Sequence, residues 1–255
     1  MKKLTLILSL VMIAGICISA PRKARRRLLL AASGFSPLDT ADCALWLDAD
    51  DYSTFTLDGT NITTWANKVT TEADATQTRS TAKPIYLADQ QGGKPAVYFD
   101  GGDYLSTGYH SIDGQTVFLI ANSIVIVKYI LGARDSEDTR SYIGTLTDHI
   151  TCGVGSVYNI YNSSYDWDGV YHYVSVDYDG STVNIYDGGT LAETREQLGT
   201  GANPIQSYYI GTFNNKGSPS VYFKGWISEV IIYKKVLTTV ERQDVEVYLA
   251  DKYSL

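Results

Sequence analysis

The segment FKGWISEVIIYKKVLTTVERQDVEVYLADKY, residues 223–253, decides the fold of this chain. A Gly-Trp pair opens an apolar run that predicts a strand over residues 227–233. The letters TTVE then predict the start of a helix, because Thr238 can cap it while Glu241 reaches back to the cap. The apolar stripe of that helix consists of Val240, Val245, Tyr248 and Leu249. We expect this helix to pack over a body made of strands.

Short apolar runs bounded by turn residues fill the chain between residue 40 and this helix. Strands without intervening helices predict an all-β antiparallel sandwich or barrel. The runs VYHYVSVDY and TVNIYD flank Asp179-Gly180-Ser181, which predicts a hairpin because Asp and Gly tolerate the positive φ of a tight turn. The predicted strands cover residues 44–48, 62–65, 84–88, 95–99, 103–106, 116–127, 129–133, 140–145, 150–154, 171–178, 182–187, 207–213, 219–224 and 226–234.

Charge is distributed unevenly along the chain. The first 32 residues hold seven basic residues and no acidic one, so the remaining 14 basic and 28 acidic residues carry a net charge of −14. An acidic body repels phosphate backbones, and we therefore expect no nucleic-acid partner. Acidic loops can hold calcium, although ordinary solubility charge is the alternative interpretation.

The N-terminus resembles an export signal, with Lys2 and Lys3 before an uncharged run over residues 4–20. The basic cluster PRKARRR follows this run and opposes translocation. The run of 17 residues is shorter than the roughly 20 that span a bilayer. Three interpretations stay open: a cleaved signal peptide, which we favour, a signal anchor, or a start assigned upstream of the true one. We expect a secreted or surface-displayed protein.

We divide the chain into a signal peptide or anchor at 1–20, a basic linker at 21–40 and one domain at 41–255. That domain contains two cysteines, Cys43 and Cys152, which allow a single disulfide in an oxidising compartment. Neither has a nearby His in the sequence that would indicate a metal site or a nucleophile. We expect two buried free thiols.

Four segments, in this order, resemble the laminin-G-like group of concanavalin A-like lectin/glucanase domains. The first two are ALWLDADDYSTFTLDGTNITTWANK (44–68) and KPIYLADQQGGKPAVYFDGGDYLST (83–107). The third is DGVYHYVSVDYDGSTVNIYDGGTLAET (168–194), and the fourth is the closing segment. The resemblance implies a jelly roll of two antiparallel sheets over 41–255. The predicted fold is this all-β sandwich with one C-terminal α-helix, together with an N-terminal hydrophobic helix formed by the apolar run.

The resemblance leaves function broad, because members of the group bind glycans, bind proteins, decorate virions or attach catalytic domains. Some related folds are glycosidases. Two positions depart from the pattern: Asn67 stands where Asp is frequent, and Tyr171 where the hairpin often has Trp.

A glycosidase needs two carboxylates about 5–10 Å apart. The glucanase branch of the resembled group places them on one strand, in a Glu-x-Asp-x-(x)-Glu motif. The segment ISEVIIYK has a single acid, Glu229, and the pairs in DWD and DYD lack a Glu partner. The three histidines are scattered, and the chain has no phosphate loop and no zinc spacing. We therefore predict a protein without catalytic residues.

Calcium is the cofactor that the resemblance implies, held at the rim of the sandwich by carboxylates and backbone carbonyls. None of the acid-rich loops has the spacing of an EF-hand. The candidate ligands are Asp135, Asp138, Asp166 and Asp168.

The segment SVYNIYNSSYDWDG, residues 156–169, is the predicted ligand site. It mixes aromatic rings, which stack on pyranose rings, with amides and carboxylates, which bind hydroxyl groups. The alternative is an edge strand whose tyrosines pack on the sandwich. The candidate binding residues are Tyr158, Tyr161, Asn162, Tyr165 and Trp167.

The sequence thus favours a lectin-like binding module whose partner is a glycan or a glycosylated protein. A structural or attachment protein is the second hypothesis, with contacts to other copies of itself or to a virion or cell-surface scaffold. A glycosidase is the third. Exposed aromatic rings would favour the first hypothesis, and two facing carboxylates in a cleft the third.

Overall fold

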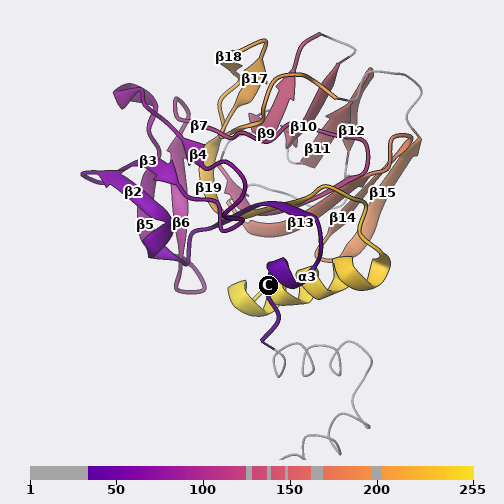
Figure 1. The fold of residues 1–255 in the computed structure, drawn as a ribbon, viewed down its shortest axis with the longest axis horizontal. Coiled ribbons are helices and arrows are strands. Elements are labelled where there is room, and N and C mark those ends of the chain that lie inside the picture. Colours follow the sequence, from indigo (N-terminus) through magenta and orange to yellow (C-terminus); the bar gives the residue numbers. More distant parts are fainter. Residues whose placement is uncertain (1–33, 125–127, 137–138, 147–148, 162–168, 197–202) are drawn as a thin grey trace, which may run out of the picture.

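The computed structural model describes residues 34–124, 128–136, 139–146, 149–161, 169–196 and 203–255. Within these ranges the protein is an antiparallel β-sandwich with one α-helix at the C-terminus (Figure 1). The predicted all-β jelly roll with a C-terminal helix is confirmed, and the predicted N-terminal helix lies outside the described residues. No helix in the described ranges is long and apolar enough to cross a membrane.

The first sheet runs in the order β15, β14, β13, β8, β19, and β19 then pairs with β6 along its first half and with β1 along its second. Strand β5 pairs with the edge of β6 that faces away from β19. The strands are β1 (Cys43–Asp48), β5 (Ile85–Gln91), β6 (Lys94–Asp100), β8 (Gln115–Ser123), β13 (Tyr171–Tyr178), β14 (Thr182–Asp187), β15 (Thr190–Glu196) and β19 (Lys224–Tyr233).

The second sheet runs in the order β12, β11, β10, β9, β16, β7, β4, β3, β2. Its strands are β2 (Phe55–Asp58), β3 (Asn61–Trp65), β4 (Ala75–Thr76), β7 (Leu105–Ser106), β9 (Lys128–Arg134), β10 (Arg140–Leu146), β11 (His149–Val154), β12 (Val157–Tyr161) and β16 (Tyr209–Ile210). The hairpin of β17 (Phe213–Asn215) and β18 (Ser218–Ser220) joins β9 through a parallel pairing. A pairing of β3 with β5 connects the two sheets at one side.

The main core lies between the two sheets. Successive side chains of a strand point to opposite faces of the sheet, so every second residue of each strand should face the core. The register of the second sheet aligns such residues across neighbouring strands. Directly opposed residues form the row Leu105, Ile210, Leu131, Ile143 and Cys152, all of them buried. Side chains of β1, β8, β13 and β19 face this row from the first sheet.

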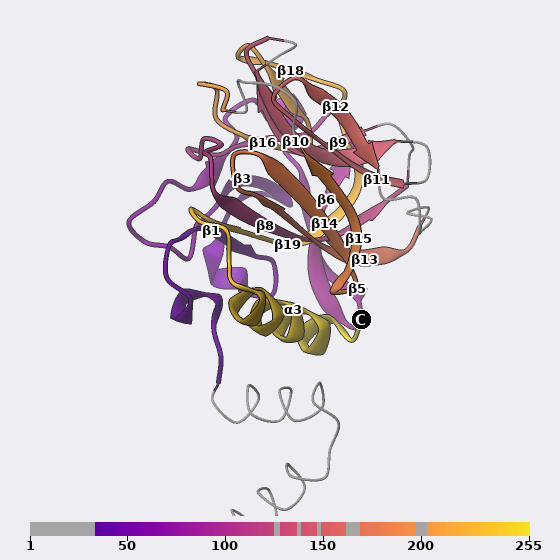
Figure 2. The same cartoon turned by 90° about the vertical axis from the view of Figure 1, so that its right-hand side faces the viewer.

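Helix α3 (Thr239–Tyr253) covers the outer face of the first sheet (Figure 2). The predicted capping box is present, with Thr238 and Glu241 bonded to each other's backbone N–H groups. Val245 and Leu249 are buried against that sheet, as predicted. Val240 was expected in the same stripe, but it is 58% exposed because it lies in the first turn, on the side away from the sheet.

Several local predictions can be compared with the structure. The hairpin at Asp179 is confirmed, with the Asp179 carboxylate accepting bonds from the N–H groups of Ser181 and Thr182. Cys43 and Cys152 are both free, as expected, but only Cys152 is fully buried, and Cys43 is half-buried. The predicted strand at 219–224 is wrong, because β18 ends at Ser220 and the chain turns at Val221. Three single-turn 3-10 helices complete the described chain: Pro37–Asp39, Tyr52–Thr54 and Ser80–Ala82.

Candidate functional site

The outer face of the second sheet carries tyrosines separated by glycines. The register places Ser106, Tyr209, Gly132 and Tyr142 side by side on neighbouring strands. A methyl group at Gly132 would lie 2.5 Å from Cβ of Tyr142, so this position of β9, opposite Tyr142 of β10, requires glycine. The next position in the row, Gly153, is covered by the Tyr142 ring in the same way. Glycine therefore lets the aromatic rings lie close to the sheet.

Three half-buried tyrosines from distant parts of the chain meet on this face. The rings of Tyr104 and Tyr209 are stacked, with centroids 4.9 Å apart. The Tyr222 ring lies 6.4 Å from Tyr104. Burial, followed by the proximity of Tyr104, raises the pKa of both Tyr209 and Tyr222, so these hydroxyl groups stay neutral donors at physiological pH.

A second aromatic group borders the first through a backbone bridge between Tyr129 and Tyr222. Tyr129 is half-buried, and its ring centroid lies 4.6 Å from those of both Phe213 and Tyr142, which are buried. The Arg134 guanidinium lies over Phe213 and donates to Oδ1 of Asn215. We call the four half-buried rings, Tyr104, Tyr129, Tyr209 and Tyr222, the tyrosine face.

The backbone beside the tyrosine face is strained. Val221 has φ 57°, a left-handed conformation that β-branched residues rarely adopt. Its carbonyl accepts a bond from the Tyr129 N–H, and its side chain is 41% exposed. Such strain costs about 1–3 kcal/mol and often occurs where a functional surface dictates the backbone. Here it positions Tyr222, the next residue, against Tyr104.

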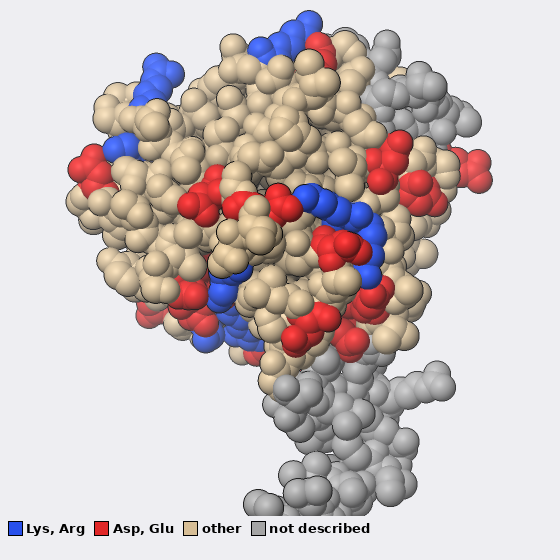
Figure 3. Space-filling view, in the orientation of Figure 1, with Lys and Arg blue, Asp and Glu red and all other residues tan. Residues whose placement is uncertain are grey.

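Charge is sparse over part of this side of the molecule. Figure 3 shows acidic side chains around α3, and a mostly uncharged surface in the upper part apart from Lys and Arg side chains at its top and upper left. Cations lie beside the tyrosine face itself, because Arg134 is over Phe213 and Arg79 lowers the pKa of Tyr222 against the larger effect of burial.

The predicted ligand segment is described only in part. Strand β12 contains Tyr158 and Tyr161, and it forms the edge of the sheet that carries the tyrosine face, with Tyr161 opposite Thr151. Asn162, Tyr165 and Trp167 lie outside the described residues. The sequence pointed to this edge and missed the tyrosine face, whose signal was the excess of Tyr (20) over Phe (6).

The predicted metal ligands are also described only in part. Asp135 is described, and its Oδ2 accepts a bond from the Ile205 N–H at 2.5 Å. Asp138, Asp166 and Asp168 lie outside the described residues. Among the residues that the structure does describe, no three His, Cys, Asp or Glu side chains come together as metal ligands would.

Glu229 has an acidic neighbour that the sequence did not predict. The antiparallel register sets Asp48 of β1 directly opposite Glu229 of β19. Lys252 of α3 lies between them and forms ion pairs with both carboxylates, at 2.8 Å for Glu229. Burial raises the pKa of Glu229; burial opposes the charge of Lys252, but the two carboxylates outweigh it and raise the pKa of that amine.

Both carboxylate oxygens of Glu229 accept two hydrogen bonds each. Oε1 of Glu229 accepts from Trp46 Nε1 at 2.8 Å and from the Tyr248 hydroxyl at 3.0 Å. Oε2 accepts from Lys252 and from the Tyr253 hydroxyl at 2.9 Å. Glu229 is fully buried. The cluster therefore joins α3 to β1 and β19, and its carboxylates do not face a cleft as a glycosidase would require.

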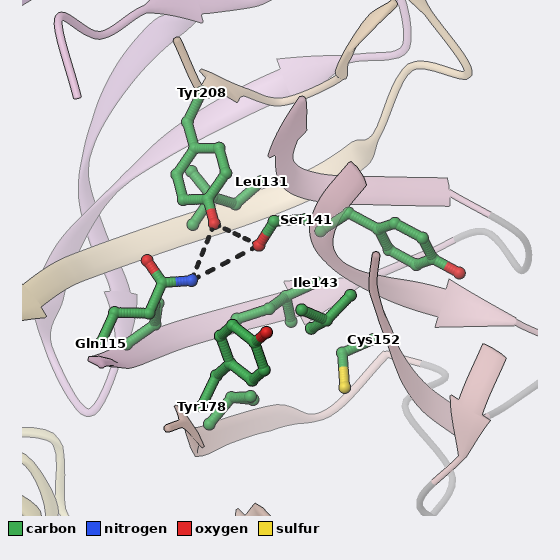
Figure 4. A pocket seen from close by; sticks show the side chains of 11 residues that line it. Gln115, Leu131, Ser141, Ile143, Cys152, Tyr178 and Tyr208 are labelled. Carbon is green, nitrogen blue, oxygen red and sulfur yellow. Dashed lines mark hydrogen bonds between the residues drawn. The ribbon is translucent and has the colours of Figure 1, made fainter. Parts of the chain in front are cut away.

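A small cavity lies between the two sheets (Figure 4). Its volume is about 10 Å³, room for about one water molecule. Nε2 of Gln115 donates to the hydroxyl groups of Ser141 and Tyr208, which also bond to each other. Burial raises the pKa of the nearby Cys152 thiol well above its usual range, so this thiol is not a nucleophile. The cavity is too small for a sugar.

Comparison with known proteins finds likeness at the level of structure. No protein-family model matches the sequence, and no curated protein sequence matches it. Domain 4 of AbnA, a GH43 extracellular arabinanase from Geobacillus stearothermophilus, solved in complex with arabinotriose, superposes with a TM-score of 0.56. It is 17% identical over 80% of this chain and 98% of that domain.

Trypanosoma rangeli sialidase in complex with the inhibitor DANA superposes with a TM-score of 0.53. It is 13% identical over 88% of this chain but only 38% of the sialidase chain. At such identities the likeness concerns the fold alone. This chain therefore shares the β-sandwich fold of these two structures.

Proposed function

We propose that this protein is a carbohydrate-binding module whose ligand docks on the tyrosine face. The observation that carries the proposal is the grouping of four half-buried tyrosines on the sheet face opposite the one that α3 covers. One face of a sugar ring is a row of C–H bonds, which packs on an aromatic ring, while phenol hydroxyls bind sugar hydroxyls.

The AbnA domain supports the class of ligand. Domain 4 of AbnA was solved with arabinotriose, and the sialidase, of whose chain only 38% is matched, was solved with the inhibitor DANA. Their residues are not transferable at the identities found. The proposal that the tyrosine face binds the ligand therefore depends only on how the four rings lie in this chain.

Binding should depend on the exposed rings. Replacing both Tyr209 and Tyr222 by Ala removes two of the four rings, and we expect the affinity for an oligosaccharide ligand to fall by about tenfold or more. A glycan array identifies that ligand, and titration calorimetry measures the loss. Tyr52→Ala is the matched control, because this tyrosine is 59% exposed in the separate aromatic cluster around Tyr86.

The predicted segment at 156–169 forms the second arm of the same experiment. Trp167→Ala with Tyr165→Ala lowers affinity if the ligand extends from the tyrosine face past the sheet edge at β12. A loss in this variant alone assigns binding to the segment and contradicts the tyrosine face. Unchanged binding in both variants, with wild-type melting curves, contradicts both sites.

We further propose that the protein is exported, as the charge pattern of residues 1–20 predicts. The second hypothesis remains a structural or attachment protein, which would contact other copies of itself or a virion or cell-surface scaffold instead of a sugar. Nothing in the described surface favours the glycosidase hypothesis, because Asp48 and Glu229 are both occupied by Lys252.

A further inference from the structure

Strand β15 ends the first sheet with an exposed edge. Five of its seven residues are exposed, and Leu191 is 53% exposed. Among the described residues β15 pairs with β14 and with no other strand. Its outer backbone groups therefore form a ready template for another strand.

The opposite edge of the same sheet is closed by the chain itself. Oδ1 of Asn67 accepts from the Trp46 N–H at 2.9 Å, and Nδ2 of Asn67 donates to the Ala44 carbonyl at 3.0 Å. The Lys68 N–H donates to the Trp46 carbonyl. These bonds replace a neighbouring strand along β1. One edge of the sheet is thus protected, while β15 hydrogen-bonds only to β14 among the described residues, with the edge strand β12 of the second sheet nearby.

The sequence of β15 is self-complementary about Thr194, the fifth of its seven residues. Glu193 and Arg195 flank Thr194, and they pair with each other at 3.0 Å within the strand. If a second β15 runs antiparallel with Thr194 opposite Thr194, each Glu193 stands opposite an Arg195. Opposite charges at directly opposed positions stabilise such a pairing, and like charges destabilise it.

We propose that two copies of this chain associate through β15, in an antiparallel pairing whose two-fold axis passes through Thr194. The pairing joins the two first sheets into one continuous sheet. The strand contains no proline, which would block the new hydrogen bonds. The arrangement is independent of the proposed sugar binding, and it would place two tyrosine faces on one particle.

Reversing one charge tests the pairing. Arg195→Glu replaces two attractive cross-pairs by two repulsive ones, and we expect the dimer dissociation constant to rise by about tenfold or more. The swap Glu193→Arg with Arg195→Glu restores both pairs and should restore the dimer. Lys216→Glu, an exposed residue of the β17–β18 turn, changes the net charge equally and should leave the dimer unchanged.

Analytical ultracentrifugation over a wide range of protein concentration measures these states. A wild-type chain that stays monomeric throughout overturns the proposal. So does a dimer that Arg195→Glu leaves intact, because its contact would lie on another surface. Melting curves confirm that each variant is folded, and the swap variant decides the case if Arg195→Glu alone unfolds.

A cysteine at the axis gives a second, geometric test. Thr194→Cys brings two thiols directly opposite each other, at a separation that a disulfide spans, so mild oxidation should yield a covalent dimer. Leu191→Cys places its two thiols six residues apart along the strand, about 20 Å, and should not cross-link. The native thiols give little background, because burial raises the pKa of Cys43 to about 12 and that of Cys152 still further. Equal cross-linking of both variants, or none, overturns the register.

Discussion

Asp103 shows how one buried carboxyl group can set a pH dependence. It lies in the turn between β6 and β7, and its Oδ2 accepts a bond from the Asp100 N–H at 2.9 Å. Burial, reinforced by the neighbouring Asp100 carboxylate, raises the pKa of Asp103 from 3.8 to about 7. The folded state therefore binds more protons than the unfolded state between about pH 4 and pH 7. The contribution of this group to stability falls as the pH rises through that window.

Asp103→Asn should remove this loss, because a neutral amide imitates the protonated acid. We expect the variant to exceed the wild type in stability at pH 8 by about 2 kcal/mol, and to lose this advantage near pH 4. Thermal melting of both proteins across this range measures the difference. Asp89→Asn, at an exposed position, is the control. A constant difference between Asp103→Asn and the wild type at all pH values would contradict the assignment.

At the scale of elements, local signals and non-local contacts account for different parts of the chain. The helix start at Thr238 and the turn at Asp179 were predicted, because both depend on side chains within three residues of the bonds they make. Strand β15 was missed, because its exposed polar residues lack the alternation of a half-buried strand. The strand predicted across Val221 was wrong, because tertiary contacts hold a left-handed residue there.

Besides the apolar packing of Val245 and Leu249, the buried cation Lys252 attaches α3 to the first sheet. Lys252→Met removes the partner that Asp48 and Glu229 share; Asp48 keeps its ion pair with Lys68, but Glu229 stays buried beside it without a cation. We expect a loss of about 3–5 kcal/mol in the free energy of unfolding, measured by denaturant titration. Lys234→Met breaks only the exposed pair with Glu72, and it should cost less than about 1 kcal/mol.

Combining Lys252→Met with Glu229→Gln separates the charge from the packing of the side chain. The amide carries no charge, so the double variant should recover part of the stability that the single variant loses. A double variant less stable than Lys252→Met alone would show that the hydrogen bonds of Glu229, rather than its charge, hold the helix.

At the scale of the whole molecule, the order of four sequence segments was sufficient to predict the sandwich, because each segment specifies strands and turns locally. The tyrosine face was not predictable in the same way. Tyr104, Tyr129, Tyr209 and Tyr222 come from four separate segments, and only the register of β7, β16 and β9 brings them together. A single sequence contains the periodicity of each strand but not the pairing between distant strands.

Calcium is best tested through the stability of the whole molecule, because a ligand that binds only the folded state raises the melting temperature of a cooperative domain. The remaining candidate loops contain Asp135, Asp138, Asp166 and Asp168, and the proposal is that carboxylates of these loops hold the ion. We expect millimolar calcium to raise the midpoint relative to chelator, and the paired change Asp166→Asn with Asp168→Asn to abolish that shift. Magnesium, which prefers water and a smaller octahedral site, should shift the wild type less. Identical melting curves in calcium and in chelator would contradict the proposal that the folded protein binds calcium.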